Sequence, residues 1–246
     1  MKLFALAFAL ALASPAAAQS PARPSPPTDR DIEGLVGAVK SFDEEEAEVK
    51  ESGGQAAEGR RRHARTLSFD RRGRMIRRII ALPDHSTRTY AFSYDKEKRY
   101  TSYTLPASPD APFGPRQFER LTVTLLRYDE AERALYQEVY TSETPSPRSL
   151  SQRWRYTFDA EGRLAESLLY TTDGREGIRT RYDFDAGRHP TEARHYAAGR
   201  PVPEVTRYTY TLDARGNWTK RVADTMLADK LGTRRVSVTY RKLSYF

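Results

Sequence analysis

Apolar and polar side chains alternate one by one along much of this chain, and helical spacing is rare. In residues 153–158, Trp154, Tyr156 and Phe158 alternate with Arg and Thr. Residues 89–94 and 207–212 repeat this pattern, with Tyr, Phe or Leu at every second position. A period of two that is rich in aromatic and β-branched residues indicates strands with one buried face. We therefore predict an all-β protein whose aromatic side chains share one face of the sheet.

Six of the alternating stretches end in an Asp followed by a tight turn. The six phrases are LSFD-RRG-R, FSYD-KEK-R, LRYD-EAE-R, YTFD-AEG-R, YDFD-AG-R and YTLD-ARG-N, with successive Asp residues 25, 34, 30, 26 and 28 positions apart. A repeat at this spacing predicts an array of supersecondary units, here one hairpin per phrase. Six hairpins give an antiparallel β-meander of about twelve strands. Residues 35–50 and 236–245 would add the strands at its two ends.

The turn residues suit tight hairpins. An Asp carboxylate can accept bonds from backbone N–H groups inside its own turn, and a Gly three residues later can take the positive φ that closes it. Lys98 and Glu132 stand at the Gly position in the second and third units, where we expect a different or looser turn. The predicted structural turn residues are Asp70, Gly73, Asp95, Asp129, Asp159, Gly162, Asp185, Gly187, Asp213 and Gly216.

The pattern aromatic-x-aromatic-Asp-x-x-Gly-Arg-Leu, clearest at residues 156–164, resembles the YD repeat of Rhs-type bacterial proteins. The resemblance covers about residues 65–223 and is strongest in the last three units. It implies an antiparallel β-meander, often surface-associated, here in a short form without a toxin domain. Residues 35–41 (LVGAVKS), followed by an acidic stretch, also resemble the opening of small exported proteins with such repeats. The resemblance brings no catalytic residue with it.

The first residues have the layout of a secretory signal. Lys2 precedes an apolar stretch at 3–13, and Ala16–Ala18 fits the small-residue cleavage rule, so we expect a signal peptide at 1–18. The apolar stretch is too short to span a bilayer. Pro-rich and Ser-rich residues 19–31 predict a disordered or extended tether, and 32–246 a single β-repeat domain. The chain has no Cys, which excludes a lipoprotein Cys and disulfides. We expect a periplasmic or secreted protein.

The formal charge is +8, and the charges are clustered. Acidic residues crowd 43–48 and basic residues crowd 60–65. These runs are either a cation, phosphate or glycan site, or two strands of a first hairpin that pair by opposite charge. The second interpretation is favoured. The net charge fits an anionic polysaccharide or lipid, or solubility alone, and nucleic acid is the least expected partner of an exported protein.

The sequence points to no reaction centre, so the catalytic residues are unknown. It has no nucleophile elbow, phosphate loop or dinucleotide motif. The repeated Asp residues each sit in a separate turn, whereas calcium sites need several converging oxygens, so we expect no metal and no cofactor. The four histidines, which we expect at the surface, have no zinc-ligand spacing. They are His63, His85, His189 and His195. A non-enzymatic role is favoured.

The aromatic residues are the feature most open to a binding role. They are either the buried face of the sheet, which we favour, or a platform for stacking sugars beside Arg side chains. The candidate ligand-binding residues are Tyr156, Tyr182, Tyr208, Tyr210 and Trp218.

The predicted meander twists and curls towards a barrel, because closure removes exposed sheet edges. We expect an exported non-enzymatic protein of the cell envelope that binds or scaffolds, with glycans, anionic surface polymers or other envelope components as partners. One alternative is an outer-membrane barrel, favoured by the alternation and Phe246, and disfavoured by Lys242, Ser244 and the density of Arg. The second alternative is an envelope hydrolase with an unidentified site. The oligomeric state stays open.

Overall fold

The computed structural model describes residues 26–52, 55–84, 86–95, 98–104, 117–141, 149–198, 200, 202–228 and 233–246. The expected signal peptide at 1–18, the first part of the tether and the long Pro-rich connectors lie outside these residues. The elements are α1 (Asp29–Ile32), β1 (Val39–Ser52), β2 (Gln55–Glu58), β3 (Arg62–Phe69), β4 (Met75–Ala81), β5 (Thr87–Asp95), β6 (Lys98–Thr104), β7 (Gln117–Asp129), β8 (Ala134–Tyr140), β9 (Leu150–Phe158), β10 (Leu164–Tyr170), β11 (Glu176–Phe184), β12 (Pro190–Ala197), β13 (Glu204–Leu212), β14 (Trp218–Met226) and β15 (Arg234–Tyr245).

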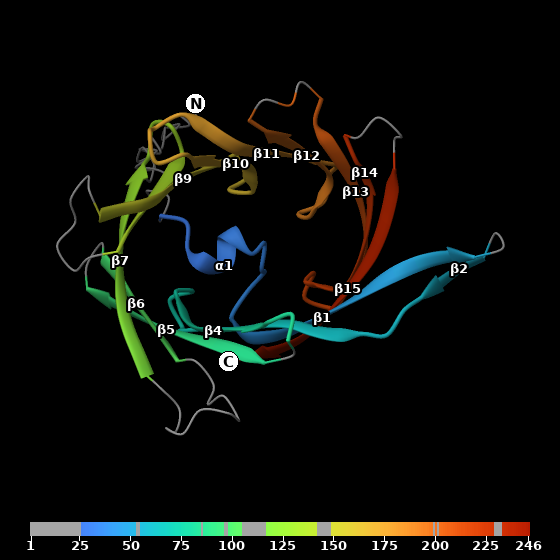
Figure 1. Cartoon of the computed structure of the whole chain (residues 1–246), viewed down its shortest axis with the longest axis horizontal. Helices are drawn as coiled ribbons and strands as arrows, with labels where there is room; N and C mark the ends of the chain where they lie inside the picture. The colour runs from blue at the N-terminus through green and yellow to red at the C-terminus, as the bar shows by residue number, and fades with distance from the viewer. Residues whose placement is uncertain are drawn as a thin grey trace, which may run out of the picture.

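The strands form one antiparallel meander that closes into a barrel of fourteen strands (Figure 1). From β3 to β15 each strand pairs with the next, and β1 pairs with both β3 and β15. The closing ladder runs from Val39 opposite Tyr245 to Val49 opposite Val236. The prediction of an all-β meander curled towards a barrel is confirmed: the six repeat hairpins supply twelve strands, and the chain ends supply the other two. β2 pairs only with β1, and this hairpin extends away from the ring.

The alternation along the strands sorts side chains between the lumen and the outer face. Residues opposite one another in a ladder point to the same side of the sheet. Tyr208 lies opposite Ala223, and Tyr210 opposite Arg221. These four residues face the lumen, as do Tyr156 of β9 and the other rings that lead into the turns. The aromatic residues therefore share one face as predicted, and that face lies inside the barrel.

The six Asp turns lie at one end of the barrel, here called the turn rim. At Asp70 and Asp159, one carboxylate oxygen accepts N–H groups two and four residues later, at 2.8–3.0 Å. Asp213 does the same at 2.9 Å. The Gly residues that close these three turns have φ of +84°, +75° and +83°. Local chemistry thus sets the turns that join consecutive strands.

The other three turns differ from this geometry, each for a local reason. Asp95 pairs directly with Lys98, which already belongs to β6. After Asp129 the positive φ, +49°, falls on Arg133, one residue past the predicted position. In the shorter fifth unit the Gly187 N–H donates to the Asp185 carboxylate at 2.6 Å. The opposite end of the barrel, where β4 leads into β5 and the turn at 171–175 lies, is here called the connector rim.

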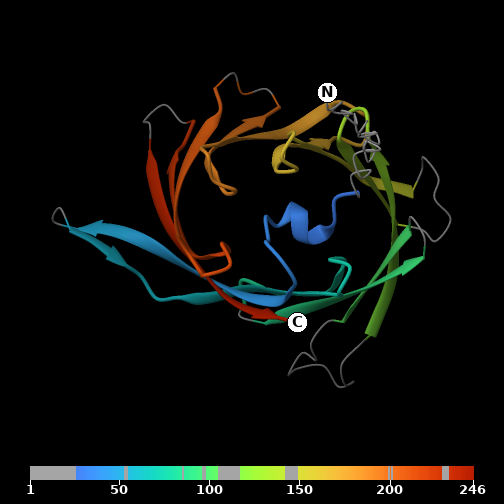
Figure 2. The same ribbon diagram turned by 180° about the vertical axis from the view of Figure 1, so that it is seen from behind.

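The N-terminal segment 28–37, here called the plug, lies inside the barrel at the turn rim, as both views of the ring show (Figures 1 and 2). The prediction of a disordered or extended tether up to residue 31 is therefore wrong for its last residues, because Asp29–Ile32 forms a helical turn, α1. A fourteen-stranded barrel is too wide for its own side chains to fill, which leaves room for an internal segment. No helix among the described residues is long and apolar enough to cross a membrane.

A small apolar core fixes the plug where it leaves the lumen. Five side chains are at most 4% exposed and pack together, and they come from the plug, β1 and β3: Leu35, Val39, Phe42, Leu67 and Phe69. Met75, Leu243 and Tyr245 pack against them. The plug therefore packs against β1 and β15, which form the closing ladder, and against β3.

Candidate functional site

A ring of four charged side chains holds the plug to the barrel wall. Arg65 donates to both carboxylate oxygens of Glu33 at 3.0 Å, and to both oxygens of Glu44 at 2.9 and 3.2 Å. Arg241 donates to Glu44 at 2.9 Å and to Glu33 at 3.3 Å. Two carboxylates and two guanidiniums thus neutralise one another across the plug, β1, β3 and β15. The forked geometry of Arg suits such bidentate contacts.

The ring is buried, so leaving any of its charges unpaired would be costly. The side chains of Glu44 and Arg241 are only 4% and 3% exposed. Burial alone would raise the pKa of Glu44, but the Arg241 and Arg65 guanidiniums outweigh it and hold that pKa below its usual range. Burial lowers the pKa of Arg241 to about 10, so the guanidinium stays charged at neutral pH. Its plane lies over the rings of Trp218 and Phe42, at 3.7 and 4.2 Å.

A second anchor fixes the start of α1 to the neighbouring strands β4, β5 and β6. The Asp29 carboxylate accepts from Arg99 at 3.0 Å, from the Met75 N–H at 2.8 Å and from the Tyr94 hydroxyl at 2.9 Å. Burial, followed by the neighbouring Asp29 charge, raises the pKa of Tyr94 well above its usual range. The phenol therefore remains a hydrogen-bond donor at any physiological pH.

A third anchor holds the plug backbone near its exit. The Asn217 side chain accepts from the Val36 N–H at 2.7 Å and donates to the Val36 carbonyl at 2.9 Å. The same side-chain amide donates to the Tyr245 hydroxyl at 3.0 Å, and that hydroxyl donates to Asp213. Asn217 is 1% exposed, and its side chain satisfies both backbone hydrogen-bonding groups of half-buried Val36.

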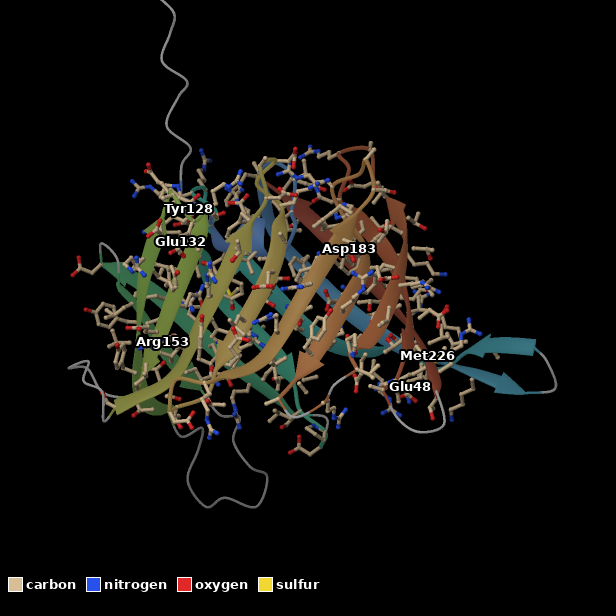
Figure 3. All side chains as sticks on the ribbon, turned by 90° about the horizontal axis from the view of Figure 1, so that it is seen from above. Glu48, Tyr128, Glu132, Arg153, Asp183 and Met226 are labelled. Carbon is tan, nitrogen blue, oxygen red and sulfur yellow. The ribbon has the colours of Figure 1, made fainter. Side chains whose placement is uncertain are left out.

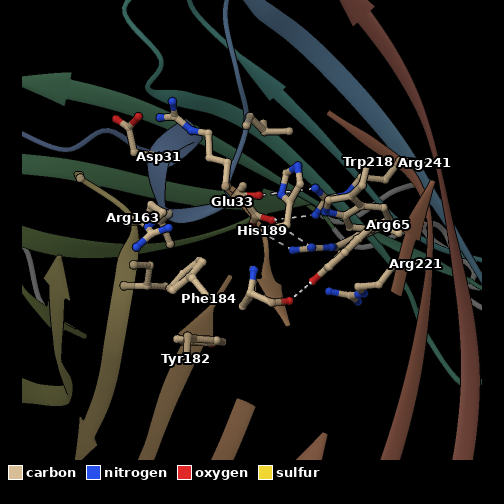
Figure 4. A pocket seen from close by; sticks show the side chains of 18 residues that line it. Asp31, Glu33, Arg65, Arg163, Tyr182, Phe184, His189, Trp218, Arg221 and Arg241 are labelled. Atoms are coloured by element: carbon tan, nitrogen blue, oxygen red, sulfur yellow. Dashed lines mark hydrogen bonds and ion pairs between the residues drawn. The ribbon is translucent and has the colours of Figure 1, made fainter. Parts of the chain in front are cut away.

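Beside the plug lies a cavity of about 160 Å³, here called the inner cavity (Figure 4). It is bounded by residues 31–35 of the plug and by the inner face of β10–β14. Aromatic and basic side chains dominate its lining, notably Tyr182, Tyr210, Trp218, His189, Arg188 and Arg221. Two larger cavities, of about 510 and 720 Å³, lie at the connector rim and share Glu46, Arg235 and Ser237 in their linings.

The structure brings the five aromatic candidates onto one lumen wall, β9 to β14. Tyr182, Tyr210 and Trp218 line the inner cavity. Tyr210 contacts both Tyr208 and Trp218, with ring centroids 6.1 and 6.3 Å apart. Tyr156 lies further along the wall and stacks on Trp154 at 5.9 Å. Trp218 is 4% exposed and belongs to the packed wall, whereas the four Tyr side chains are only partly buried. The set therefore combines core with an accessible aromatic surface.

The favoured interpretation of the acidic and basic runs, strands that pair by opposite charge, fits β1 and β3, where Glu44 lies opposite Arg65. The sequence did not predict that this pair lies inside the barrel. The expectation about the histidines is wrong for two of them. The histidines were expected at the surface, yet His189 is 8% exposed and its Nε2 lies 2.8 Å from the Gly216 carbonyl. His195 faces the lumen beside Thr180 at 3.0 Å. His63 is exposed, and His85 lies outside the described residues.

Sequence reasoning missed Glu33, Arg241, Asn217 and Arg221. One signal was available: the sixth phrase ends in Asn where the other five end in Arg. In the first and fourth units that Arg pairs with the Asp of its own turn, as Arg163 does with Asp159 at 2.7 Å. Asn217 at this position cannot form that ion pair, and its side chain binds the plug backbone instead. No sequence pattern distinguished Glu33 or Arg241, because their partners are distant in sequence.

The outer face of the barrel is covered by ion pairs between neighbouring strands. Arg181 pairs with Glu166 at 2.9 Å, and Arg153 with Glu138 at 2.8 Å. A longer chain of pairs crosses β11 to β13 through Asp183, Arg194, Glu192 and Arg207. Nitrogen and oxygen atoms accordingly lie along the wall in side view, where Arg153 and Asp183 are labelled (Figure 3).

No protein-family model and no curated protein matches this chain. Among solved structures, a porin-like protein from Bacteroides vulgatus is 14% identical, with a TM-score of 0.41, over 86% of this chain and 99% of that one. A porin-like protein from Bacteroides uniformis is 13% identical, with a TM-score of 0.43, over 85% and 99%. A LolA superfamily protein from Nitrosomonas europaea is 11% identical, with a TM-score of 0.31, over 88% and 91%. Likenesses this weak carry no information about function.

The site offers chemistry for binding. Within the described part of the chain, no group of three or more His, Cys, Asp or Glu residues could hold a metal ion. Every described carboxyl group whose pKa is shifted has it lowered, so none of these is poised as a proton donor near neutral pH. Aromatic faces, hydroxyl groups and guanidiniums dominate the lumen wall around the inner cavity.

Proposed function

We propose that this protein is an exported, non-enzymatic barrel of the cell envelope that binds a glycan or a glycan fragment inside its lumen. One observation carries the proposal: a partly buried aromatic wall lines a lumen that the plug occupies at one rim and that has large cavities at the other. Small-molecule sites are concave and combine apolar surface with a few fixed polar groups. Sugars present flat apolar faces ringed by hydroxyls, which such a wall suits.

A continuous inner surface joins the cavities at the connector rim to the inner cavity. Along β13, Thr206, Tyr208 and Tyr210 point into the lumen in turn, because every second residue of a strand faces the same side. Thr206 lines the 510 Å³ cavity and Tyr210 lines the inner cavity, so Tyr208 lies between them. A ligand that enters at the connector rim therefore meets aromatic rings as it approaches the plug.

The outer face favours an aqueous compartment over the outer-membrane alternative. A lipid-facing band tolerates few charges, and Arg at mid-membrane costs roughly 2–4 kcal/mol in such barrels. Here Arg181 and Arg207 on the outer face have side chains that are 52% and 78% exposed. Cell fractionation tests this point. We expect recovery in the periplasm or the medium without detergent, and recovery only from detergent-solubilised outer membrane would overturn the assignment.

The lowered carboxyl pKa values also favour binding over the hydrolase alternative. A glycosidase needs a carboxylic acid that stays protonated near neutral pH, as well as a second carboxylate. Glu44 is buried in the lumen, but Arg65 and Arg241 hold it ionised. Its oxygens are already occupied by three N–H donors from these two residues.

The test is a glycan array with the purified protein, followed by titration of each hit using the fluorescence of Trp154 and Trp218. Tyr208→Ala removes a lumen ring and should weaken binding roughly three- to tenfold, the worth of one aromatic contact. Tyr136→Ala is the matched control, because Tyr136 lies on the outer face against Arg127. No glycan bound at all, or equal losses in the two variants, would refute lumen binding.

A further inference from the structure

We propose that Arg221 is the recognition residue for an acidic sugar, and that it binds the carboxylate or phosphate group of that sugar in the inner cavity. This inference deepens the proposed function and rests on it. It assigns the ligand class, a sugar that carries an oxyanion, and the place where the negative charge is bound.

Arg221 packs against two aromatic rings but has no ionic partner among the described residues. Its guanidinium lies over the rings of Trp218 and Tyr208, at 4.8 and 5.4 Å. Among the described residues its one hydrogen bond is a long contact of 3.4 Å to the hydroxyl of Thr239. The Nε atom is buried and has no hydrogen-bond partner in the part of the chain described here. No ion pair joins Arg221 to a carboxylate among the same residues.

Three other arginines in the lumen form ion pairs with carboxylates. Arg65 and Arg241 share Glu33 and Glu44, and Arg99 pairs with Asp29 at 3.0 Å. Arg99 also has a buried Nε without a partner, so that feature alone does not distinguish Arg221. What distinguishes Arg221 from these three is that no carboxylate of the described residues pairs with it. A cation removed from water is costly unless an anion compensates it, and a bound oxyanion would supply that compensation.

The charge balance of the inner cavity also favours an anionic ligand. Five arginines line it, against Asp31 and Glu33 as the acidic residues. Arg65 and Arg241 are neutralised by Glu33 with Glu44, and Arg163 by Asp159 of its own turn. Arg221 and Arg188 therefore remain as two cations against the one carboxylate of Asp31, which accepts from Thr28 at 2.7 Å. The cavity keeps a positive charge in excess beside aromatic rings, which fits an anionic group attached to a sugar.

The volume of the cavity limits what can enter. About 160 Å³ accommodates a monosaccharide unit, so a longer chain would extend towards the connector rim. Arg can hold a carboxylate or a phosphate oxygen pair with two parallel N–H groups. Trp218 and Tyr208 fix the plane of the guanidinium before the ligand arrives, which reduces the entropy lost on binding.

Calorimetric titration separates the possibilities, with glucuronate, glucose 6-phosphate, glucose and inorganic phosphate as probes. We expect one or both acidic sugars to bind at least roughly tenfold more tightly than glucose, the worth of a charged hydrogen bond. Arg221→Gln should abolish that preference and leave the affinity for glucose unchanged. Arg221→Lys, which keeps the charge, should restore part of it. Arg207→Gln, on the outer face of the adjacent strand, is the matched control and should change nothing.

The other possible outcomes contradict either the inference or the proposed function. Equal binding of acidic and neutral sugars, unaffected by Arg221→Gln, would overturn the inference while the proposed function stands. Inorganic phosphate that binds as tightly as glucose 6-phosphate would overturn the assignment to a sugar. If Arg221→Gln fails to fold, Arg188→Gln at the exposed edge of the cavity replaces it, and an unchanged preference for acidic sugars in that variant would count against the excess positive charge as its cause. If the protein binds no glycan on the array, that result would instead refute the proposed function itself.

Discussion

Glu44→Gln tests the buried charge ring that holds the plug. The substitution keeps the size of the side chain and removes its charge, so Arg65 and Arg241 are left with Glu33 as their one carboxylate in the ring. Breaking a buried ion pair by removing one partner costs about 3–5 kcal/mol, because it leaves an uncompensated charge. Arg65 is 26% exposed and water can relieve part of that cost, so we expect the lower end, about 3 kcal/mol.

Urea unfolding at pH 7, followed by tryptophan fluorescence, measures this loss. With an m-value of about 3 kcal/mol/M, a loss of that size lowers the unfolding midpoint by on the order of 1 M. Glu166→Gln is the matched control, because Glu166 pairs with Arg181 on the outer face and exposed pairs contribute about 0–1 kcal/mol. Equal losses in the two variants would refute the buried ring as an anchor.

The same comparison has a predicted pH dependence. Folding lowers the pKa of Glu44, so its stabilisation is complete above the ordinary value of 4.5 and is lost as the pH falls through the folded-state value. The stability difference between wild type and Glu44→Gln should therefore be full at pH 7 and shrink below pH 4.5. A difference that stays constant down to the acid limit would contradict the assigned cause.

Four further substitutions test the plug and its surroundings. Gly73→Ala and Gly162→Ala should each cost about 1–3 kcal/mol because both positions have positive φ, but only at Gly73 would the new Cβ lie 2.7 Å from Arg30 and Thr28. Trypsin should therefore cleave after Arg30 faster in Gly73→Ala alone, and equal rates would count against the contact. Asn217→Ala leaves the Val36 N–H and carbonyl unpaired and should cost about 2–4 kcal/mol in urea unfolding, so a loss under about 1 kcal/mol would argue against the third anchor. Burial lowers the pKa of His189, so wild-type stability should fall relative to His189→Gln as the pH drops below 6.5, and parallel pH profiles would contradict its burial as a neutral ring.

The sequence predicted those parts of the fold that depend on local chemistry. Alternation at residues 153–158 fixes which side chains share a face, and the Asp and Gly of a turn such as Asp159–Gly162 lie within a few residues of each other. These predictions concern neighbours along the chain, so one sequence suffices for them. The strand count followed as well, since each phrase forms one hairpin.

The sequence could not predict what long-range pairing determines. Glu44 and Arg241 are 197 residues apart, and they meet only because β1 and β15 close the barrel. Without that closure nothing in the acidic run marks Glu44 as a lumen residue, so its burial was not predicted. The plug was missed because Pro-rich and Ser-rich residues precede it, and a single helical turn leaves no periodic pattern. Arg221 was missed because a missing ion pair among the described residues shows only in the folded barrel.

Hydrogen exchange at the plug tests most directly whether the N-terminal segment is bound inside the barrel. The Arg30 amide donates to the Gly73 carbonyl at 3.1 Å, and the Val36 amide donates to Asn217 at 2.7 Å. We predict that both amides exchange only when the barrel unfolds, at rates like those of the central strands. Exchange of both at the rate of an unstructured peptide, while the strands stay protected, would contradict the plugged barrel.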